Sequence, residues 1–192
     1  MNIQLTDKKV QIFHSTLKLI NIHGFHGSPM SKIAKDADVA VGSIYHYFPS
    51  KEDLIIELYW YCKEILNKEV FSTVDNTLPY EAQFKMIWKN LIQYYTKNTD
   101  HFSFLEQFYG SPFYEGIRTN VFKQKTERNV LVSFLQEGIK DKQLKDLNVR
   151  LLISAYLGVA ISLVRGCLYE KTKPQEDELN TMVDIIWNGV KL

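Results

Sequence analysis

Apolar side chains recur every three or four residues along almost the whole chain, which is the spacing of helices that bury one face. The strict alternation of apolar and polar residues that marks a half-buried strand does not occur in the sequence. We therefore predict an all-α protein. The expected helices span residues 7–23, 29–37, 40–48, 51–73, 79–98, 101–109, 113–140, 148–169 and 176–190.

The segment 28–54 predicts two short helices joined by a tight turn. Ser28 is a candidate N-cap, and Pro29 suits the first helical position that follows. Asp38 and Val39 form the expected turn, because aspartate tolerates the left-handed backbone conformation better than most residues. Two helices joined so closely indicate a helix-turn-helix, a motif whose second helix enters the major groove of DNA.

The second short helix ends at Pro49, and a long third helix begins directly after it. Ser50 and Asp53 have the spacing of a capping box at the start of that helix. Within the second helix, Ile44 and Phe48 are expected to pack inward and hold it against its neighbours.

These residues resemble the DNA-binding signature of TetR-type bacterial transcriptional regulators. The resemblance covers about the first quarter of the chain at the level of motifs, and it extends to the whole chain in length and helical character. It rests on Val10, Phe13, Leu17, Ile20, Gly24, Phe25, Ile33, Ala34, Ala37, Val39, Gly42, Ile44, Tyr45, Tyr47, Phe48, Ser50, Lys51 and Glu52.

Three positions depart from the usual family pattern. Asp38 replaces a glycine, Ala40 replaces a serine or threonine, and Val41 stands where the family often has lysine. Ala40 has no hydroxyl with which to cap the helix, and Val41 removes a cation from the side that faces DNA.

The resemblance implies a division into a helix-turn-helix DNA-binding domain, residues 1–50, and a helical ligand-binding and dimerisation domain, residues 51–192. It also implies a double-stranded DNA operator and a small-molecule effector as partners.

We expect two kinds of DNA contact. Small apolar and hydroxyl side chains on the second helix suit thymine methyl groups, whereas serines, aromatic tips and a lysine near helix starts suit phosphates. Gly42 either packs closely or lets the helix approach DNA, and the resemblance favours the second role. The predicted contact residues are Ser28, Ser31, Ala40, Val41, Gly42, Ser43, Tyr45, His46, Tyr47 and Lys51.

Charge gives this prediction little support. The net charge is +1, and residues 1–54 hold six lysines against five acidic residues. Arg118 is the first arginine of the chain, so the common contact between arginine and guanine is not available in the DNA module.

The part of the chain between residues 88 and 122 is rich in aromatic side chains. A packed core explains most of them, but a glycine–proline break near residue 110 also favours an apolar pocket between helices. By resemblance, this is where an effector binds. The predicted pocket residues are Trp88, Tyr95, Phe102, Phe104, Phe108 and Phe122, with Glu106 as a polar partner.

The helix expected at 148–169 is apolar on two faces and therefore needs two partners. One face, lined with small residues, suits close approach by a second copy of the chain, and the closing helix adds further apolar residues. We predict a homodimer whose interface includes Leu151, Ala155, Gly158, Ser162, Leu179, Val183 and Ile186.

The sequence gives less support to a membrane protein, a metal-binding protein or an enzyme. No apolar run reaches membrane-spanning length, and the N-terminus lacks a signal-peptide pattern, so we expect a cytoplasmic protein. Cys62 and Cys167 have no metal-type neighbours and are expected to be buried, inert thiols. No phosphate loop, metal-ligand spacing or nucleophile motif is present, so we expect no catalytic residue, metal or cofactor.

One alternative stays open at this point. The chain could be a helical small-molecule-binding or interaction protein whose DNA module has degenerated, as Ala40, Val41 and the missing arginine would allow. Binding to random duplex DNA at low salt separates this reading from a ligand-responsive repressor.

Overall fold

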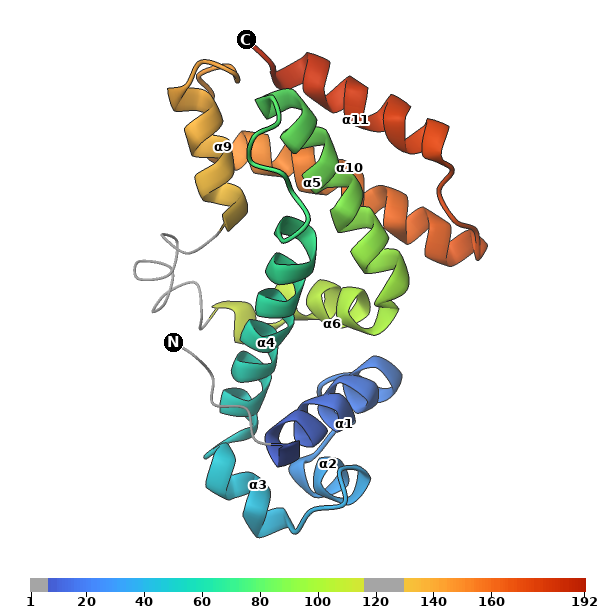
Figure 1. Ribbon diagram of the computed structural model, residues 1–192. Coiled ribbons are helices and arrows are strands. Elements are labelled where there is room, and N and C mark those ends of the chain that lie inside the picture. Colours follow the sequence, from blue (N-terminus) through green and yellow to red (C-terminus); the bar gives the residue numbers. More distant parts are fainter. Residues whose placement is uncertain (1–6, 116–129) are drawn as a thin grey trace. The chain divides into compact units, whose positions relative to one another are not determined.

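The computed structural model describes residues 7–115 and 130–192, and nearly all of them are helical (Figure 1). In these ranges the extended structure amounts to an isolated antiparallel bridge between Leu144 and Lys191. The helices are α1 (Asp7–His23), α2 (Met30–Asp36), α3 (Val41–Tyr47), α4 (Lys51–Phe71), α5 (Tyr80–Lys97), α6 (Thr99–Tyr109), α9 (Val130–Lys140), α10 (Val149–Glu170) and α11 (Glu176–Val190). The prediction of an all-α protein is confirmed.

Most expected helices are found within one or two residues of their predicted ends. α1 ends at Gly24, whose φ of 67° is the left-handed conformation that favours glycine. One half of the capping box expected at the start of α4 is present, since the Asp53 amide donates to Ser50 Oγ at 3.1 Å. The Asp53 carboxylate accepts from the Ser50 hydroxyl at 2.7 Å instead of closing the box on the Ser50 amide. The start of the helix expected at 113–140 lies partly outside the described residues, and α9 begins at Val130.

The chain forms two compact units. The first contains Met1–Glu64 and Thr99–Asn120, and the second contains Ile65–Asn98 and Val121–Leu192. α4 therefore supplies residues to both units, and α6 belongs to the first unit together with α1, α2 and α3. The predicted domain boundary after residue 50 follows the sequence motif, whereas these units follow the packing.

Aromatic and aliphatic side chains form the core of the first unit. The ring of Phe13 on α1 lies 5.5 Å from that of Phe48, directly after α3, and 4.9 Å from that of Tyr61 on α4. Phe13, Ile44 and Phe48 are fully buried. Phe13 thereby joins α1 to the end of α3 and to α4.

α6 packs against α1, the loop after it and α4 through polar as well as apolar contacts. Asn21 Nδ2 donates to the carbonyl of Asp100 at 3.0 Å. The ring of Phe25, after α1, lies 6.2 Å from Phe104 in an edge-on arrangement, and Tyr59 of α4 stacks on Phe108 at 4.4 Å.

The second unit is organised around two buried aromatic side chains with satisfied polar atoms. Trp88 Nε1 on α5 donates to the carbonyl of Tyr156 on α10 at 3.0 Å, and Tyr156 Oη donates to the carbonyl of Phe84 at 2.8 Å. Burial raises the pKa of Tyr156. These reciprocal bonds fix α5 against α10.

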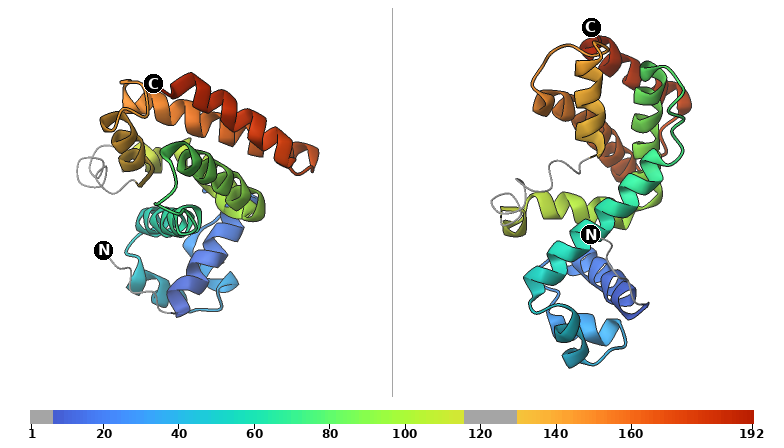
Figure 2. Two further views of the ribbon diagram at one scale, coloured as in Figure 1. Left: turned by 45° about the horizontal axis from the view of Figure 1, so that its top comes forward. Right: turned by 60° about the vertical axis from the view of Figure 1, so that its left-hand side comes forward.

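α10 and α11 lie side by side in both views of Figure 2. α10 buries Leu152, Tyr156, Ala160, Val164 and Cys167 and leaves its other side exposed. Contrary to the expectation from sequence, this helix is long and apolar enough to cross a membrane by length and composition.

The two cysteines are both buried and unpaired, as predicted. Burial raises the pKa of the Cys62 thiol to about 12, so the reactive thiolate is scarce at neutral pH.

Candidate nucleic-acid interface

The turn between α2 and α3 has the geometry that the sequence predicts. Asp38 adopts a φ of 51°, and the Val39 amide donates to the carbonyl of Ala34 at 3.0 Å. The Ala37 amide donates to the carbonyl of Ile33 at 2.9 Å, so the carbonyls of Ile33 and Ala34 near the end of α2 are satisfied. The turn therefore tolerates the replacement of the family glycine by aspartate.

The inner faces of the two short helices determine which residues of α3 point outward. Ile33 and Ala34 of α2 are buried, as are Ile44 of α3 and Phe48 immediately after it. Figure 1 shows α2, the turn and α3 following one another beside α1. With Ile44 buried in this core, the opposite face of α3 is turned to solvent.

Most of the predicted DNA contacts lie on that outer surface. Ser31, Ala40, Val41, Gly42, Tyr45 and His46 are exposed, and Ser43, Tyr47 and Lys51 are half-buried. Val41 is 42% exposed and Tyr45 is 50% exposed, although both are largely apolar. The successive side chains Tyr45, His46 and Tyr47 are not all buried, in agreement with their 100° spacing around the helix.

Gly42 sits on the open side of α3. A Cβ atom added there would meet nothing within 4 Å. Intramolecular packing therefore does not require glycine at this position, and the predicted close approach to DNA stays a prediction.

Ser28 does not occupy the predicted position. It is fully buried, and its hydroxyl donates to the carbonyl of Gly24 at 2.9 Å. Pro29, rather than Ser28, is the N-cap of α2. Because the hydroxyl is buried and hydrogen-bonded within the loop after α1, we remove Ser28 from the candidate interface.

Lys51 has a partly structural role. Its Nζ donates to the carbonyl of Phe25, which links the loop after α1 to the start of α4. Burial lowers the pKa of this ammonium group. The contact leaves other Nζ protons for a phosphate, so the predicted role stays a prediction.

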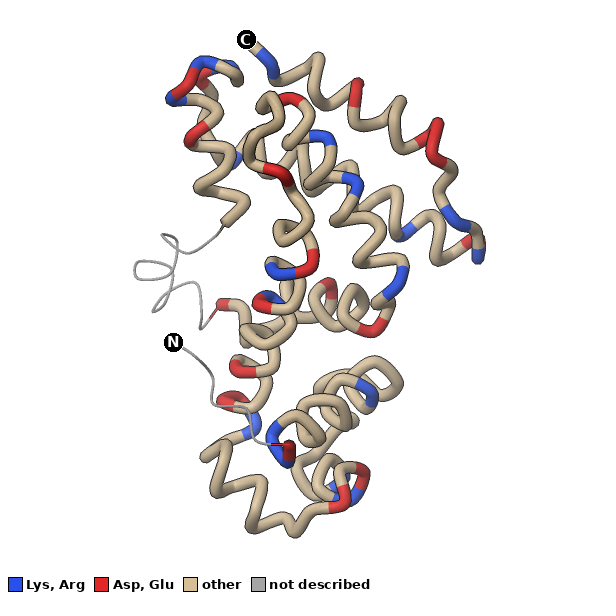
Figure 3. The backbone as a smooth tube through the Cα atoms, in the orientation of Figure 1, with Lys and Arg blue, Asp and Glu red and all other residues tan. Residues whose placement is uncertain are grey.

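Two exposed lysines were missing from the predicted interface. Lys32 and Lys35 are both exposed on α2, whereas Lys18 of α1 pairs with Asp36 at 2.7 Å. The hydrogen bond from Lys18 lowers the pKa of Asp36. Helical periodicity would have predicted both as exposed, since Lys32 and Lys35 do not lie on the buried face of α2 that contains Ile33 and Ala34. α3 itself carries no acidic residue, lysine or arginine (Figure 3).

The predicted effector-pocket residues are distributed over both units. Trp88 and Tyr95 are buried in the second unit, and Phe102, Phe104 and Phe108 are buried in the first. Glu106 is half-buried, and Phe122 lies outside the described residues. Packing within each unit accounts for the buried rings, and their role in a pocket stays a prediction.

The predicted dimer residues separate into two groups. Leu151, Ala155, Gly158 and Ser162 are exposed along α10. The prediction is wrong for α11, because Leu179, Val183 and Ile186 are at least 94% buried within the chain itself. That face of α11 packs on its own bundle; the exposed apolar residue of α11 is Ile185, which is 61% exposed.

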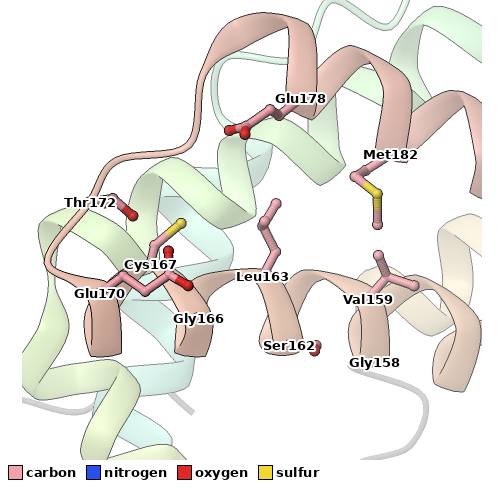
Figure 4. A pocket seen from close by; sticks show the side chains of 10 residues that line it. All are labelled: Gly158, Val159, Ser162, Leu163, Gly166, Cys167, Glu170, Thr172, Glu178 and Met182. Atoms are coloured by element: carbon pink, nitrogen blue, oxygen red, sulfur yellow. The ribbon is translucent and has the colours of Figure 1, made fainter.

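A groove of about 540 Å³ runs between α10 and α11. Val159, Leu163 and Met182 point toward one another across it, and Gly158, Ser162 and Gly166 form its small-residue side (Figure 4). Added Cβ atoms at Gly158 and Gly166 would meet nothing within 4 Å. This surface can therefore be approached closely by another helix.

Two protein-family models match the chain. Residues 12–58 match the model described as "Bacterial regulatory proteins, tetR family". Residues 79–191, more than half of the chain, match the model described as "Tetracyclin repressor-like, C-terminal domain". The first match includes the helix-turn-helix, and the second includes α5 through α11.

Similar proteins agree with these matches over the whole length. An HTH-type transcriptional regulator of Haemophilus influenzae is 25% identical over 186 residues, which is 97% of either chain. The crystal structure of a TetR-family transcriptional regulator from Haemophilus influenzae Rd gives a TM-score of 0.83 at 25% identity and 97% coverage of both chains. The transcriptional regulator FadR from Bacillus subtilis, solved in complex with stearoyl-CoA, gives 0.71 at 22% identity, covering 93% of this chain and 95% of FadR.

Proposed function

The chain belongs to the TetR family of bacterial regulatory proteins and is a helix-turn-helix transcriptional regulator; from this premise we propose that it is a cytoplasmic repressor. In this proposal a homodimer binds a roughly palindromic duplex operator, and a small, largely apolar effector releases it.

The outer face of α3 is the observation that carries the proposal. Ile44 is fully buried, while Val41, Gly42, Tyr45 and His46 are exposed on a helix held by a well-formed turn. A helix presented in this way fits a major groove. Because the module is intact, the departures at Asp38, Ala40 and Val41 do not favour the alternative of a degenerate DNA module.

The exposed side of α10 supports the dimer. Leu151, Ala155, Gly158 and Ser162 recur at intervals of three or four residues, so they form one continuous stripe. An uncharged stripe of mostly small residues on a 22-residue helix suits an isologous contact with its own copy. Two copies joined by α10 would present two α3 helices to two half-sites.

A solved protein of the same fold supports an apolar effector. FadR from Bacillus subtilis, which has the same fold, was solved with stearoyl-CoA, a ligand with a long apolar chain. α4 is continuous from Lys51 to Phe71 and contributes to both units, so it offers a route by which a bound ligand changes the DNA-binding unit. A coupling free energy of about 1–3 kcal/mol would make a working switch, and DNA would weaken effector binding by the same factor.

Selection of bound duplexes from a random pool at low salt tests the DNA-binding function. We expect enrichment of a two-fold symmetric sequence; failure of the full-length protein to retain any duplex would refute the proposal. A thermal-shift screen that includes acyl-CoA thioesters then tests the effector. A hit should lower operator affinity by about 5- to 150-fold, whereas a tight ligand that leaves this affinity unchanged would refute the switch.

A further inference from the structure

We propose that α3 recognises its operator through the C5-methyl groups of thymine bases, with Val41 as the principal contact. This inference rests on the proposed DNA-binding function and specifies the bases that the regulator selects. It follows from the chemistry of α3, from the exposure of its outer face and from the position of the nearest cations.

The residue types of α3 exclude most forms of direct base recognition. Arginine and lysine are suited to guanine, asparagine and glutamine to adenine, and acidic residues to cytosine. α3 contains none of these, because its sequence is Val-Gly-Ser-Ile-Tyr-His-Tyr. Apolar contact with the thymine methyl group remains. Hydroxyl or imidazole groups can also form hydrogen bonds, but these do not discriminate strictly between bases.

The exposed side chains are placed for such apolar contact. Val41 is 42% exposed and Tyr45 is 50% exposed, and they lie one helical turn apart on the same face. Ala40, directly before the helix, is also exposed. An aliphatic side chain left in water at this point would gain burial from a methyl group in the groove.

Gly42 lies beside this apolar face and allows the helix to come close. A Cβ atom at Gly42 would meet nothing within the protein, so the space above it is open. A methyl–methyl contact needs carbon atoms about 4 Å apart, and a recognition helix without a side chain at this point can reach that distance.

The neighbouring cations do not supply the missing base recognition. Lys32 and Lys35 lie on α2, the helix of this motif that crosses the DNA backbone. Ammonium groups there contact phosphates, which position the protein but carry no direct sequence information. Base selection is therefore left to the outer face of α3, which carries no lysine, arginine, aspartate or glutamate (Figure 3).

The test begins with the duplex selected from a random pool. Each thymine of a half-site is then replaced by deoxyuridine, which removes the C5-methyl group and keeps every hydrogen-bonding group. At a contacted thymine we expect affinity to fall about fourfold, the value of one buried methylene-sized group. Symmetric replacement in both half-sites should lower it about 16-fold, since the two effects multiply.

A double-mutant cycle assigns the contact to Val41. Val41→Ala should lower affinity for the thymine operator and have no further effect on the deoxyuridine operator. Ile22→Ala is the matched control, because Ile22 is an aliphatic residue of the same unit, 62% exposed near the end of α1. That variant should keep both the affinity and the thymine preference of the parent.

The outcomes separate the two levels of the proposal. If the protein retains duplexes but deoxyuridine at every thymine changes affinity by less than twofold, the inference is overturned while the DNA-binding function stands. Equal losses for Val41→Ala on both operators would remove Val41 from the contact. If no duplex is retained, the DNA-binding function itself fails, and the inference fails with it.

Discussion

Two helices of this chain, α3 and α10, expose a largely apolar face to solvent. The two faces differ in length and in how far their side chains project. α3 has seven residues and exposes Val41 and Tyr45 around a glycine. α10 has 22 residues and exposes a long stripe of mostly small side chains that includes Ala155 and Gly158.

The difference shows how the shape of an apolar surface limits its partner. A short helix with projecting side chains fits a groove with discrete features such as base edges. A long stripe of small residues fits the side of another helix, because the backbones can approach along its whole length. Exposed apolar area alone would not distinguish these two uses.

The largest expected effect comes from breaking the α10 surface. Gly158→Glu places a charge on the stripe, and the protomer should still fold because an added Cβ atom meets nothing within 4 Å. We expect monomers in analytical ultracentrifugation and a loss of operator affinity of roughly 10²- to 10⁴-fold, since two half-sites are no longer bound together.

Gln93→Glu is the matched control for that charge, because Gln93 is exposed on α5 rather than on α10. It should remain dimeric and bind the operator normally. A Gly158→Glu variant that stays dimeric would exclude this face of α10 as the interface.

The next largest effect is on stability, and it distinguishes the buried face of α11 from the exposed face of α10. Ile186→Ala should lower the free energy of unfolding by about 2–5 kcal/mol, because Ile186 is 94% buried within the chain. Leu151→Ala, at a position 56% exposed, should change it by less than about 0.5 kcal/mol.

Urea unfolding measured in the monomeric Gly158→Glu background compares these two variants without a contribution from dimerisation. Equal costs for Ile186→Ala and Leu151→Ala would contradict the assignment of the two faces.

A smaller effect should come from filling the open space on α3. Gly42→Ala leaves the fold unstrained, so thermal stability should stay the same or rise slightly. Operator affinity should fall by roughly tenfold, comparable to one mismatched base pair, if the helix backbone lies close to DNA. Fluorescence anisotropy with a labelled operator measures this change, and wild-type affinity would show that the space above Gly42 remains open in the complex.

The smallest effect tests the predicted phosphate contact of Lys51, which lies outside the α3 and α10 surfaces. Lys51→Ala should weaken binding to all duplexes alike and lower the slope of log affinity against log salt by about two per dimer. Lys51→Arg should retain the slope, and Lys68→Ala, at an exposed position farther along α4, should not change it. An unchanged slope in Lys51→Ala would mean that Lys51 serves only its bond to the Phe25 carbonyl.

Local signals predicted the DNA module well. The left-handed Asp38, the glycine stop of α1 and the Ser50 cap of α4 each depend on residues close together in the chain, and helical phase indicated the inward positions Ile44 and Phe48. Propensity, turn chemistry and helical phase fix such features within a few residues. The exposed face of α3 followed directly from them.

The sequence by itself therefore determined the helices, the helix-turn-helix and the outward residues of α3, because helical periodicity and local turn chemistry indicate them. Only the tertiary structure decided that Ser28 bonds to Gly24, that α6 belongs with α1, and that Leu179, Val183 and Ile186 face their own bundle. An apolar stripe on a helix shows that something must cover it, but it does not say whether the cover is the same chain or a second copy. That choice depends on packing between segments far apart in sequence, which helical periodicity does not record.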